Sequence, residues 1–244
     1  MYRRAAGVLS ALALCVTVVG TSGPTLDAAA AGAPQQGPQA PSLLPAMPPL
    51  SPPATFHAYS VGFDSSASSY SGVKVYRKDL SLNPSTGCVY QPIWVGNAAY
   101  QTNELGSEYG GTSKGCEGAN DTWYWGYQTN KTTFIPGGTR AMTPGQTHYF
   151  SIYYYLGYYY FYVDSTLMYD RYFNQYFAYA DAGLESYDSA VSVAPFPDSS
   201  LQYTLSGGSW TNWSGEDTQT VNSPLCGRWI SATDWQAGEN QSSC

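Results

Sequence analysis

The chain has 244 residues, of which 43% are hydrophobic and only 11% are charged, and its formal net charge is −7. Nucleic-acid binding depends on basic patches that neutralise phosphates, so this composition argues against a nucleic-acid partner and against an anionic membrane surface. After the N-terminal segment, no stretch reaches the length of about 18 apolar residues that a transmembrane helix requires. We therefore expect no membrane attachment after processing.

The N-terminus has the pattern of an export signal. Two arginines lie among the first four residues, and the apolar run Ala5–Gly20 has the length of a signal-peptide core. Small residues in Asp27–Ala33 offer a cleavage site. We expect residues 1–31 to be a signal peptide and the mature protein to be secreted. Lipidation of Cys15 is the alternative, but Leu14 is a poor residue before a lipid-modified cysteine.

A segment rich in proline and alanine separates this signal from the folded part. Residues 32–54 carry no charge and no periodic pattern, and their prolines favour an extended spacer. They form either a linker or a propeptide. Residues 55–244 are left for the domain, about 190 residues, which suits one domain with its own core. We expect it to be a monomer.

The cysteines predict two disulfides. Besides Cys15 the chain has Cys88, Cys116, Cys226 and Cys244, an even number in an exported protein. Of the three possible pairings we favour Cys88–Cys116 and Cys226–Cys244, because each closes a local loop. A zinc site is the alternative, but no CxxC spacing supports it. The sequence implies no metal and no cofactor.

The domain consists of short β-rich runs divided by Gly, Pro, Asn, Asp and Ser, and no segment has a clear helical pattern. This predicts an all-β fold, an antiparallel β-sandwich. In chain order the runs are residues 56–63, 72–80, 89–96, 122–130, 146–156, 158–164, 175–187, 190–194 and 201–205.

Half of the residues in Tyr149–Asp164 are tyrosine. We expect a hairpin with its tip at Leu156-Gly157, since Gly157 can adopt a positive φ. Alternate side chains of a strand point to opposite faces. One face of the first strand is expected to be core, and the other carries a tyrosine stripe that either stabilises the sheet by cross-strand pairing or binds a ligand. The two sets are Phe150, Ile152 and Tyr154, and Tyr149, Ser151, Tyr153 and Tyr155.

Carboxylates are the best candidates for chemistry. The chain has only two histidines and lacks a GxSxG elbow, an HExxH motif, a P-loop and a dinucleotide GxGxxG. Glu104 and Glu185 lie in runs of apolar and small residues, where desolvation would raise a carboxyl pKa toward acid–base use. Glu108 is an alternative partner for Glu104, from which it is four residues away. The competing interpretation is that these glutamates face solvent on an acidic surface.

The order of "IWVG", "NELG" and, much later, "AGLESYD" resembles the glutamic peptidase group. In its neprosin-type branch, two glutamates on a β-sandwich of the concanavalin-like, jelly-roll type activate water against a peptide bond at acid pH. The resemblance implies Glu104 and Glu185 as catalytic residues. In the fungal branch a glutamine replaces one glutamate, and Gln101 is then the candidate.

Two further functions remain open. The same architecture serves non-catalytic carbohydrate-binding modules and glycoside hydrolases, which also use two carboxylates; an exported structural protein without chemistry is the third possibility. The expected partner is thus an extracellular polypeptide or polysaccharide. A binding module would tolerate Glu→Gln changes but not the loss of its aromatic side chains. The candidate substrate-binding residues are Trp94, Gln101, Trp123, Trp125, Tyr149, Tyr153 and Tyr155.

Overall fold

The computed structural model describes residues 56–130, 133–214 and 219–244. The expected signal peptide (1–31) and the proline-rich segment (32–54) lie outside these residues, so both remain predictions. The described chain contains fifteen strands and one short 3₁₀ helix, η1 (Thr112–Lys114). None of its helical segments has the length and apolar character needed to cross a bilayer.

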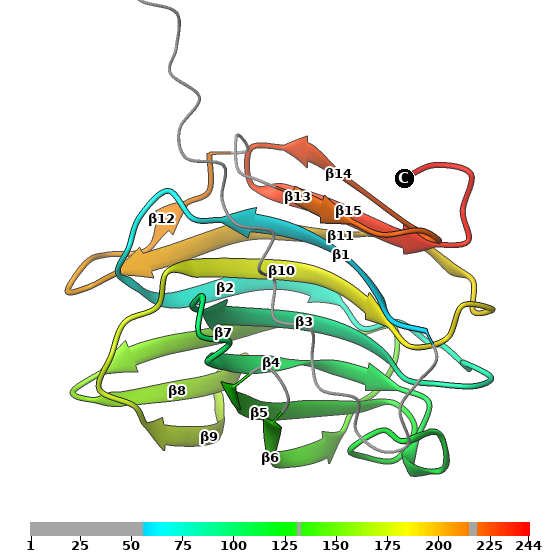
Figure 1. Cartoon of the computed structure of the whole chain (residues 1–244), viewed down its shortest axis with the longest axis horizontal. Coiled ribbons are helices and arrows are strands. Elements are labelled where there is room, and N and C mark those ends of the chain that lie inside the picture. Colours follow the sequence, from blue (N-terminus) through cyan, green and yellow to red (C-terminus); the bar gives the residue numbers. More distant parts are fainter. Residues whose placement is uncertain (1–55, 131–132, 215–218) are drawn as a thin grey trace, which may run out of the picture. The chain divides into compact units, whose positions relative to one another are not determined.

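The strands form two antiparallel sheets, which confirms the predicted β-sandwich (Figure 1). The seven-stranded sheet has the order β13 (Gln219–Val221), β1 (Ala58–Asp64), β10 (Tyr179–Ser186), β3 (Val89–Gly96), β4 (Thr102–Tyr109), β5 (Thr122–Asn130) and β6 (Thr133–Ala141). The eight-stranded sheet has the order β14 (Leu225–Ser231), β15 (Asp234–Glu239), β11 (Val193–Leu205), β2 (Tyr70–Lys78), β7 (Thr147–Tyr155), β8 (Tyr158–Val163) and β9 (Thr166–Tyr172), with β12 (Thr211–Asn212) paired to β11.

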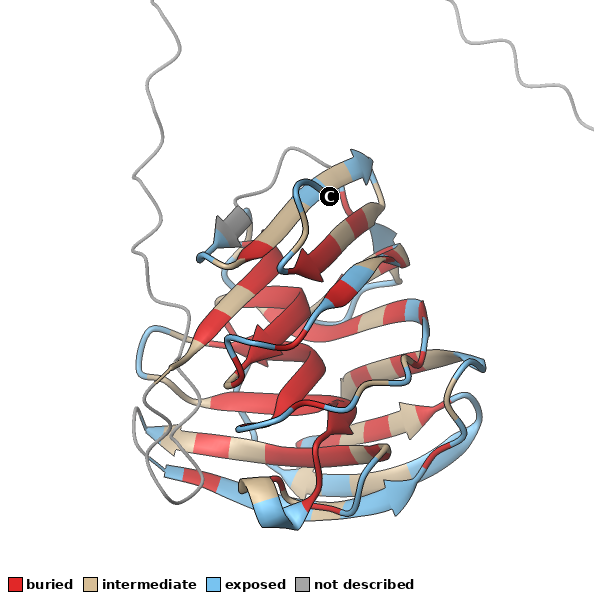
Figure 2. Cartoon of the chain, turned by 90° about the vertical axis from the view of Figure 1, so that its right-hand side faces the viewer, coloured by how far each residue is buried: buried red, intermediate tan, exposed pale blue. Residues whose placement is uncertain are grey.

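The main core takes alternate side chains from the strands of both sheets, and Figure 2 shows how continuous the buried stretches are along them. Alternation places every second residue of a strand on the same face. The seven-stranded sheet therefore has a second set of side chains on its outer face, which points away from the other sheet. The seven-stranded sheet contributes to the main core Ala58, Val89, Ile93, Val95, Leu105, Tyr109, Trp125, Ala180, Ala182 and Leu184.

The tyrosine-rich segment forms the predicted hairpin. Strands β7 and β8 pair from Phe150↔Val163 to Tyr155↔Tyr158, and the two tip residues, Leu156 and Gly157, have φ values of 50° and 88°. Two consecutive positive φ values are typical of the tight turns that match strand twist. Phe150 and Ile152 are fully buried, as expected for the core face.

Both predicted disulfides are present. Cys88–Cys116 joins the residue before β3 to the loop that follows η1. Cys226–Cys244 ties β14 to the C-terminal residue. Each closes a local loop and so restricts the unfolded chain.

One buried cation links the two sheets. Arg77 of β2 forms an ion pair with Asp198 of β11 (Nε–Oδ1 2.8 Å) and also donates to the carbonyl oxygens of Gln91 and Pro92 in β3. Proline has no N–H for the ladder, and the β10–β3 register has no pairs between Ala182↔Ile93 and Glu185↔Tyr90. The guanidinium thus satisfies carbonyls at the irregular centre of β3.

Candidate active site

Four carboxyl groups lie on the outer face of the seven-stranded sheet, which we call the glutamate face. On β4, Glu104 and Glu108 alternate with core residues, and on β10, Asp181 and Glu185 do the same. The register places them in two cross-strand rows. The first row runs Asp181, Trp94, Glu104, and the second runs Glu185, Tyr90, Glu108.

Small residues separate these rows. Gly183 of β10, Pro92 of β3 and Gly106 of β4 occupy the intermediate positions. A Cβ atom at Gly106 would collide with the carbonyl oxygen of Gln91, and one at Gly183 with that of Ser60, so a close approach of backbones requires glycine at both sites. The longer side chains of the flanking rows can therefore approach one another across this strip.

Glu104 is only 3% exposed and has one side-chain partner, the hydroxyl of Tyr124, which donates to its Oε1 atom. Burial raises the pKa of Glu104 well above 4.5, the nearby Glu185 raises it further, and the bond from Tyr124 partly offsets both effects. A carboxyl group in this state keeps its proton at mildly acid pH and can donate it.

Glu185 is also 3% exposed but has different partners. The Nε2 atom of His57 lies 2.5 Å from its Oε1 atom, and the hydroxyl of Tyr187 donates to the same oxygen at 3.1 Å. The imidazole of His57 stacks on the Tyr187 ring with centroids 4.5 Å apart. A protonated His57 forms an ion pair with the carboxylate form of Glu185, which suits a base that takes a proton from water.

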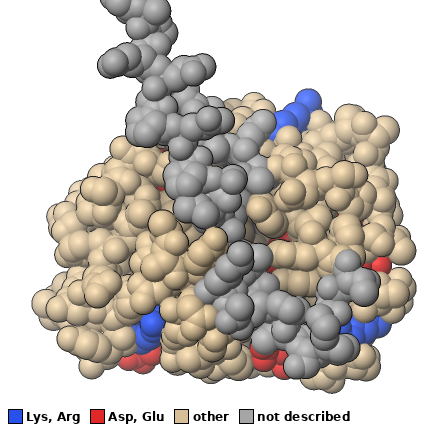
Figure 3. All heavy atoms as spheres, viewed as in Figure 1, with Lys and Arg blue, Asp and Glu red and all other residues tan. Residues whose placement is uncertain are grey.

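The two glutamates interact electrostatically, because Glu185 contributes to the raised pKa of Glu104. Pairs of carboxyl groups with unlike surroundings can divide acid and base roles. The surface seen in Figure 3 carries few charged side chains, in keeping with the 11% of charged residues in the chain. The pair of glutamates can therefore activate water with one carboxylate and donate a proton to the substrate from the other carboxyl group.

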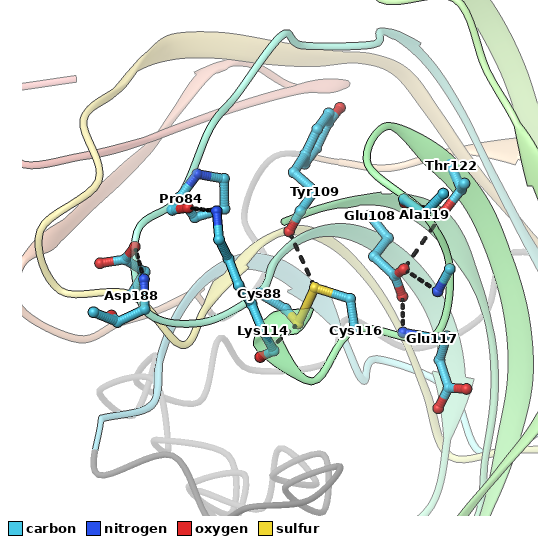
Figure 4. Close-up of a disulfide and its surroundings, with 12 residues drawn as sticks. Pro84, Cys88, Glu108, Tyr109, Lys114, Cys116, Glu117, Ala119, Thr122 and Asp188 are labelled. Carbon is cyan, nitrogen blue, oxygen red and sulfur yellow. Dashed lines mark hydrogen bonds between the residues drawn. A yellow bond between two sulfur atoms is a disulfide. The ribbon is translucent and has the colours of Figure 1, made fainter. Parts of the chain in front are cut away.

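Glu108 serves the disulfide-anchored loop instead (Figure 4). Its carboxylate accepts the backbone N–H groups of Glu117 (3.0 Å) and Gly118 (2.6 Å), in the segment that follows Cys116. Burial raises the pKa of Glu108 to about 7, and these N–H groups limit the increase. Since its oxygens are engaged by the loop, Glu108 is a structural residue and not the partner of Glu104.

The predicted substrate-binding residues separate into several locations. Trp94 lies on the glutamate face between Asp181 and Glu104, and it is 5% exposed. Gln101 lies in the turn between β3 and β4, where its side-chain oxygen accepts a hydrogen bond from Asn97. A turn position removes Gln101 from the sheet face, so the structure does not support it as the replacement for a catalytic glutamate.

Trp123 and Trp125 point to the other side of β5. Trp125 belongs to the main core, and Trp123 packs against that core and donates to Asp79 at 2.9 Å. On this strand it is Tyr124 that shares a face with the glutamates. The alternation of β5 thus places these two candidate substrate-binding residues on the face opposite to Glu104 and Glu185.

The tyrosine stripe belongs to the other sheet. Tyr149, Tyr153 and Tyr155 are on β7, and their neighbours across the ladder are tyrosines of β2 and β8. Tyr153 stacks on Tyr162, with ring centroids 5.6 Å apart and an interplanar angle of 13°. The stripe and the glutamates therefore lie on different sheets and cannot form one groove. A binding role for the stripe stays a prediction of its own.

The structure adds residues that the sequence analysis did not select. Tyr124, Tyr187 and His57 contact the two glutamates, and Asp181 lies on their face. Asp181 and Tyr187 could have been found from the sequence. Each is an even number of residues from Glu185, so alternation along β10 and the residue after it predicts that they share its face. His57 immediately precedes β1 and Tyr124 is on β5, and the sheet order places them beside Glu185 and Glu104.

No family model matches the chain, and no curated protein matches it. Among solved structures, scytalido-glutamic peptidase with a transition state analog inhibitor is 9% identical, with 75% of this chain and 97% of that chain covered and a TM-score of 0.49. CG-16, a homodimeric agglutinin from chicken liver, is 13% identical (59% and 99% covered, TM-score 0.39). A Bacillus licheniformis β-glucanase is 12% identical (70% and 64% covered, TM-score 0.32). A similarity of this size does not extend to function, because one architecture serves unrelated chemistries.

Proposed function

We propose that the protein is an exported hydrolase that cleaves peptide bonds of polypeptides at acid pH, with Glu104 and Glu185 as its catalytic pair. The observation that carries this proposal is the placement of two buried carboxyl groups with different hydrogen-bond partners on one sheet face. Two disulfides support export, since such bonds persist in oxidising compartments.

In this mechanism the carboxylate of Glu185 takes a proton from water, and the resulting hydroxide adds to the peptide carbonyl carbon. Protonated Glu104 donates to the carbonyl oxygen as negative charge develops there. When the C–N bond breaks, Glu185 passes its proton to the leaving nitrogen, and Glu104 recovers its own from the oxygen. Water and the peptide bond are thereby converted to a carboxylic acid and an amine, with both glutamates restored.

The neighbouring side chains position this pair. Tyr187 and His57 hold the same oxygen of Glu185, which leaves its other oxygen for water. Tyr124 fixes one oxygen of Glu104. A general acid or base that is held in position, as Glu104 and Glu185 are here, typically contributes about 10²- to 10⁴-fold to a rate.

The pH dependence of cleavage tests the proposal. Glu104 acts only while protonated, and its pKa is raised above 4.5, so the rate should fall as the pH rises through that raised value. We expect digestion of a denatured protein substrate, followed from about pH 3 to about pH 8, to be fastest on the acid side of that fall. The contrary result is no digestion at any pH by a loading of enzyme at which a pepsin control is complete.

A second candidate function rests on the outer tyrosines of the eight-stranded sheet. Tyr155 and Tyr172 are 59% and 64% exposed, and Tyr76 and Tyr158 are exposed as well. Aromatic rings with free edges and hydroxyl groups suit stacking on sugar rings. If digestion fails, binding of neutral polysaccharides to this face becomes the leading function, and calorimetric titration with soluble glucans would measure it.

A further inference from the structure

A third carboxyl group of the glutamate face has no role in the proposed mechanism. Asp181 is on β10, four residues before Glu185 and on the same side of the strand. Across β3 it lies in one row with Glu104, with Trp94 between them. Two inter-strand steps of about 4.8 Å separate Asp181 from Glu104 along that row.

Asp181 is fully buried, and neither of its carboxyl oxygens has a hydrogen-bond partner among the residues that the structure describes. Phe63 of β1 and Trp94 of β3 are its cross-strand neighbours. The indole of Trp94 offsets part of the burial effect on the Asp181 pKa, but its N–H makes no hydrogen bond of ordinary geometry. A buried carboxyl group without a partner is costly, and a hydrogen-bond donor from outside the chain would offset that cost.

The surroundings specify the chemistry of that group. Phe63, Trp94 and Tyr179 form an aromatic cluster beside Asp181. Aromatic rings next to a carboxylate favour a cation on an apolar stem, because the stem packs on the rings and the cation pairs with the carboxylate. Burial and the nearby Asp64 raise the pKa of Asp181, and an incoming cation has the opposite effect.

We propose that Asp181 forms a cation-binding subsite that takes the side chain of a lysine or arginine of the polypeptide substrate. The inference rests on the proposed peptidase function and names a substrate preference for it. An extended peptide rises about 3.3 Å per residue. The distance between Asp181 and Glu104 along their shared row thus places the basic residue within about three residues of the bond that is cleaved.

Paired peptides test this subsite. One set carries lysine at a single position within three residues of the cleaved bond, and the matched set carries norleucine, which keeps the stem and lacks the ammonium group. Cleavage is compared at the highest pH at which the parent still cleaves, because ionised Asp181 is favoured there. We expect kcat/KM to favour lysine by about tenfold or more at one position. Asp181→Asn should reduce that ratio to near unity and leave cleavage of the norleucine peptide within a few-fold of the parent.

Asp170→Asn is the matched control, because Asp170 is an exposed residue of β9 on the other sheet. It should keep the full lysine preference. The proposal is overturned if the parent shows no lysine preference at any position, a result that does not depend on the folding of a variant, or if the preference survives in folded Asp181→Asn.

Calorimetric binding of the same peptides to Glu185→Gln separates the two proposals. Tighter binding of the lysine peptide without cleavage by the parent protein would support the subsite and contradict the peptidase function. Equal binding of both peptides, or no binding of either, together with equal or absent cleavage, would overturn the subsite.

Discussion

Replacing Glu185 with glutamine should lower the rate of peptide-bond cleavage by about a thousandfold, and Glu104→Gln should have an effect of similar size. A carboxamide cannot take a proton from water or donate one as an acid. Yet it is almost isosteric and can still contact His57 and Tyr187 at one site or accept from Tyr124 at the other. The measurement is kcat/KM on one peptide across the pH range, with folding checked by circular dichroism.

Glu117→Gln is the matched control, since Glu117 lies in the disulfide-anchored loop and only its backbone N–H contacts Glu108. It should keep nearly full activity. The stability of Glu104→Gln separates catalysis from structure. The native pKa of Glu104 is raised, so this residue favours folding below pH 4.5 and that contribution is lost as pH rises. At neutral pH the glutamine variant should therefore be at least as stable as the parent. A variant that loses activity together with stability would contradict the assignment.

Replacing Arg77 with methionine should lower the free energy of unfolding by about 3 to 5 kcal/mol. The change leaves Asp198 as a buried charge without its cation, and it leaves the carbonyls of Gln91 and Pro92 without their donor. Because Pro92 lies between the two glutamate rows, activity should fall as well, even though Arg77 lies on the other sheet. Urea unfolding monitored by tryptophan fluorescence measures the effect.

Arg228→Met is the matched control at an exposed arginine and should change stability by less than about 0.5 kcal/mol. The double variant Arg77→Met, Asp198→Leu should recover much of the loss, because it removes both buried charges. A single variant as stable as the parent would show that the cross-sheet contacts of Arg77 contribute little.

Local features of the fold were predictable from the sequence. Alternation in Tyr149–Asp164 separated core from outer side chains, and the Leu156-Gly157 tip gave the hairpin turn. The disulfide pairing followed from loop lengths alone. The alternation and the hairpin tip depend on neighbours in sequence, where the two-residue period and turn chemistry act directly. Each disulfide closes a local loop.

The composition of the site depends on pairings between distant strands, and a single sequence does not encode these locally. Strand β1 lies beside β10, over a hundred residues later, and this pairing brings His57 to Glu185. The same sheet order separates the tyrosines of β7 from the glutamates. The aromatic content of the sequence does not show that the tyrosine stripe and the glutamates lie on different sheets.

The ionisation of Glu104 tests the central claim most directly, because it needs no substrate. In protein labelled with ¹³C at the glutamate carboxyl carbons, the Glu104 signal is assigned from its absence in Glu104→Gln and followed through a pH titration. We predict that Glu104 titrates well above 4.5 and that Glu185→Gln lowers its pKa, since that change removes a nearby like charge. A Glu104 carboxyl that titrates at its ordinary value, and does not respond to Glu185→Gln, would contradict the coupled pair.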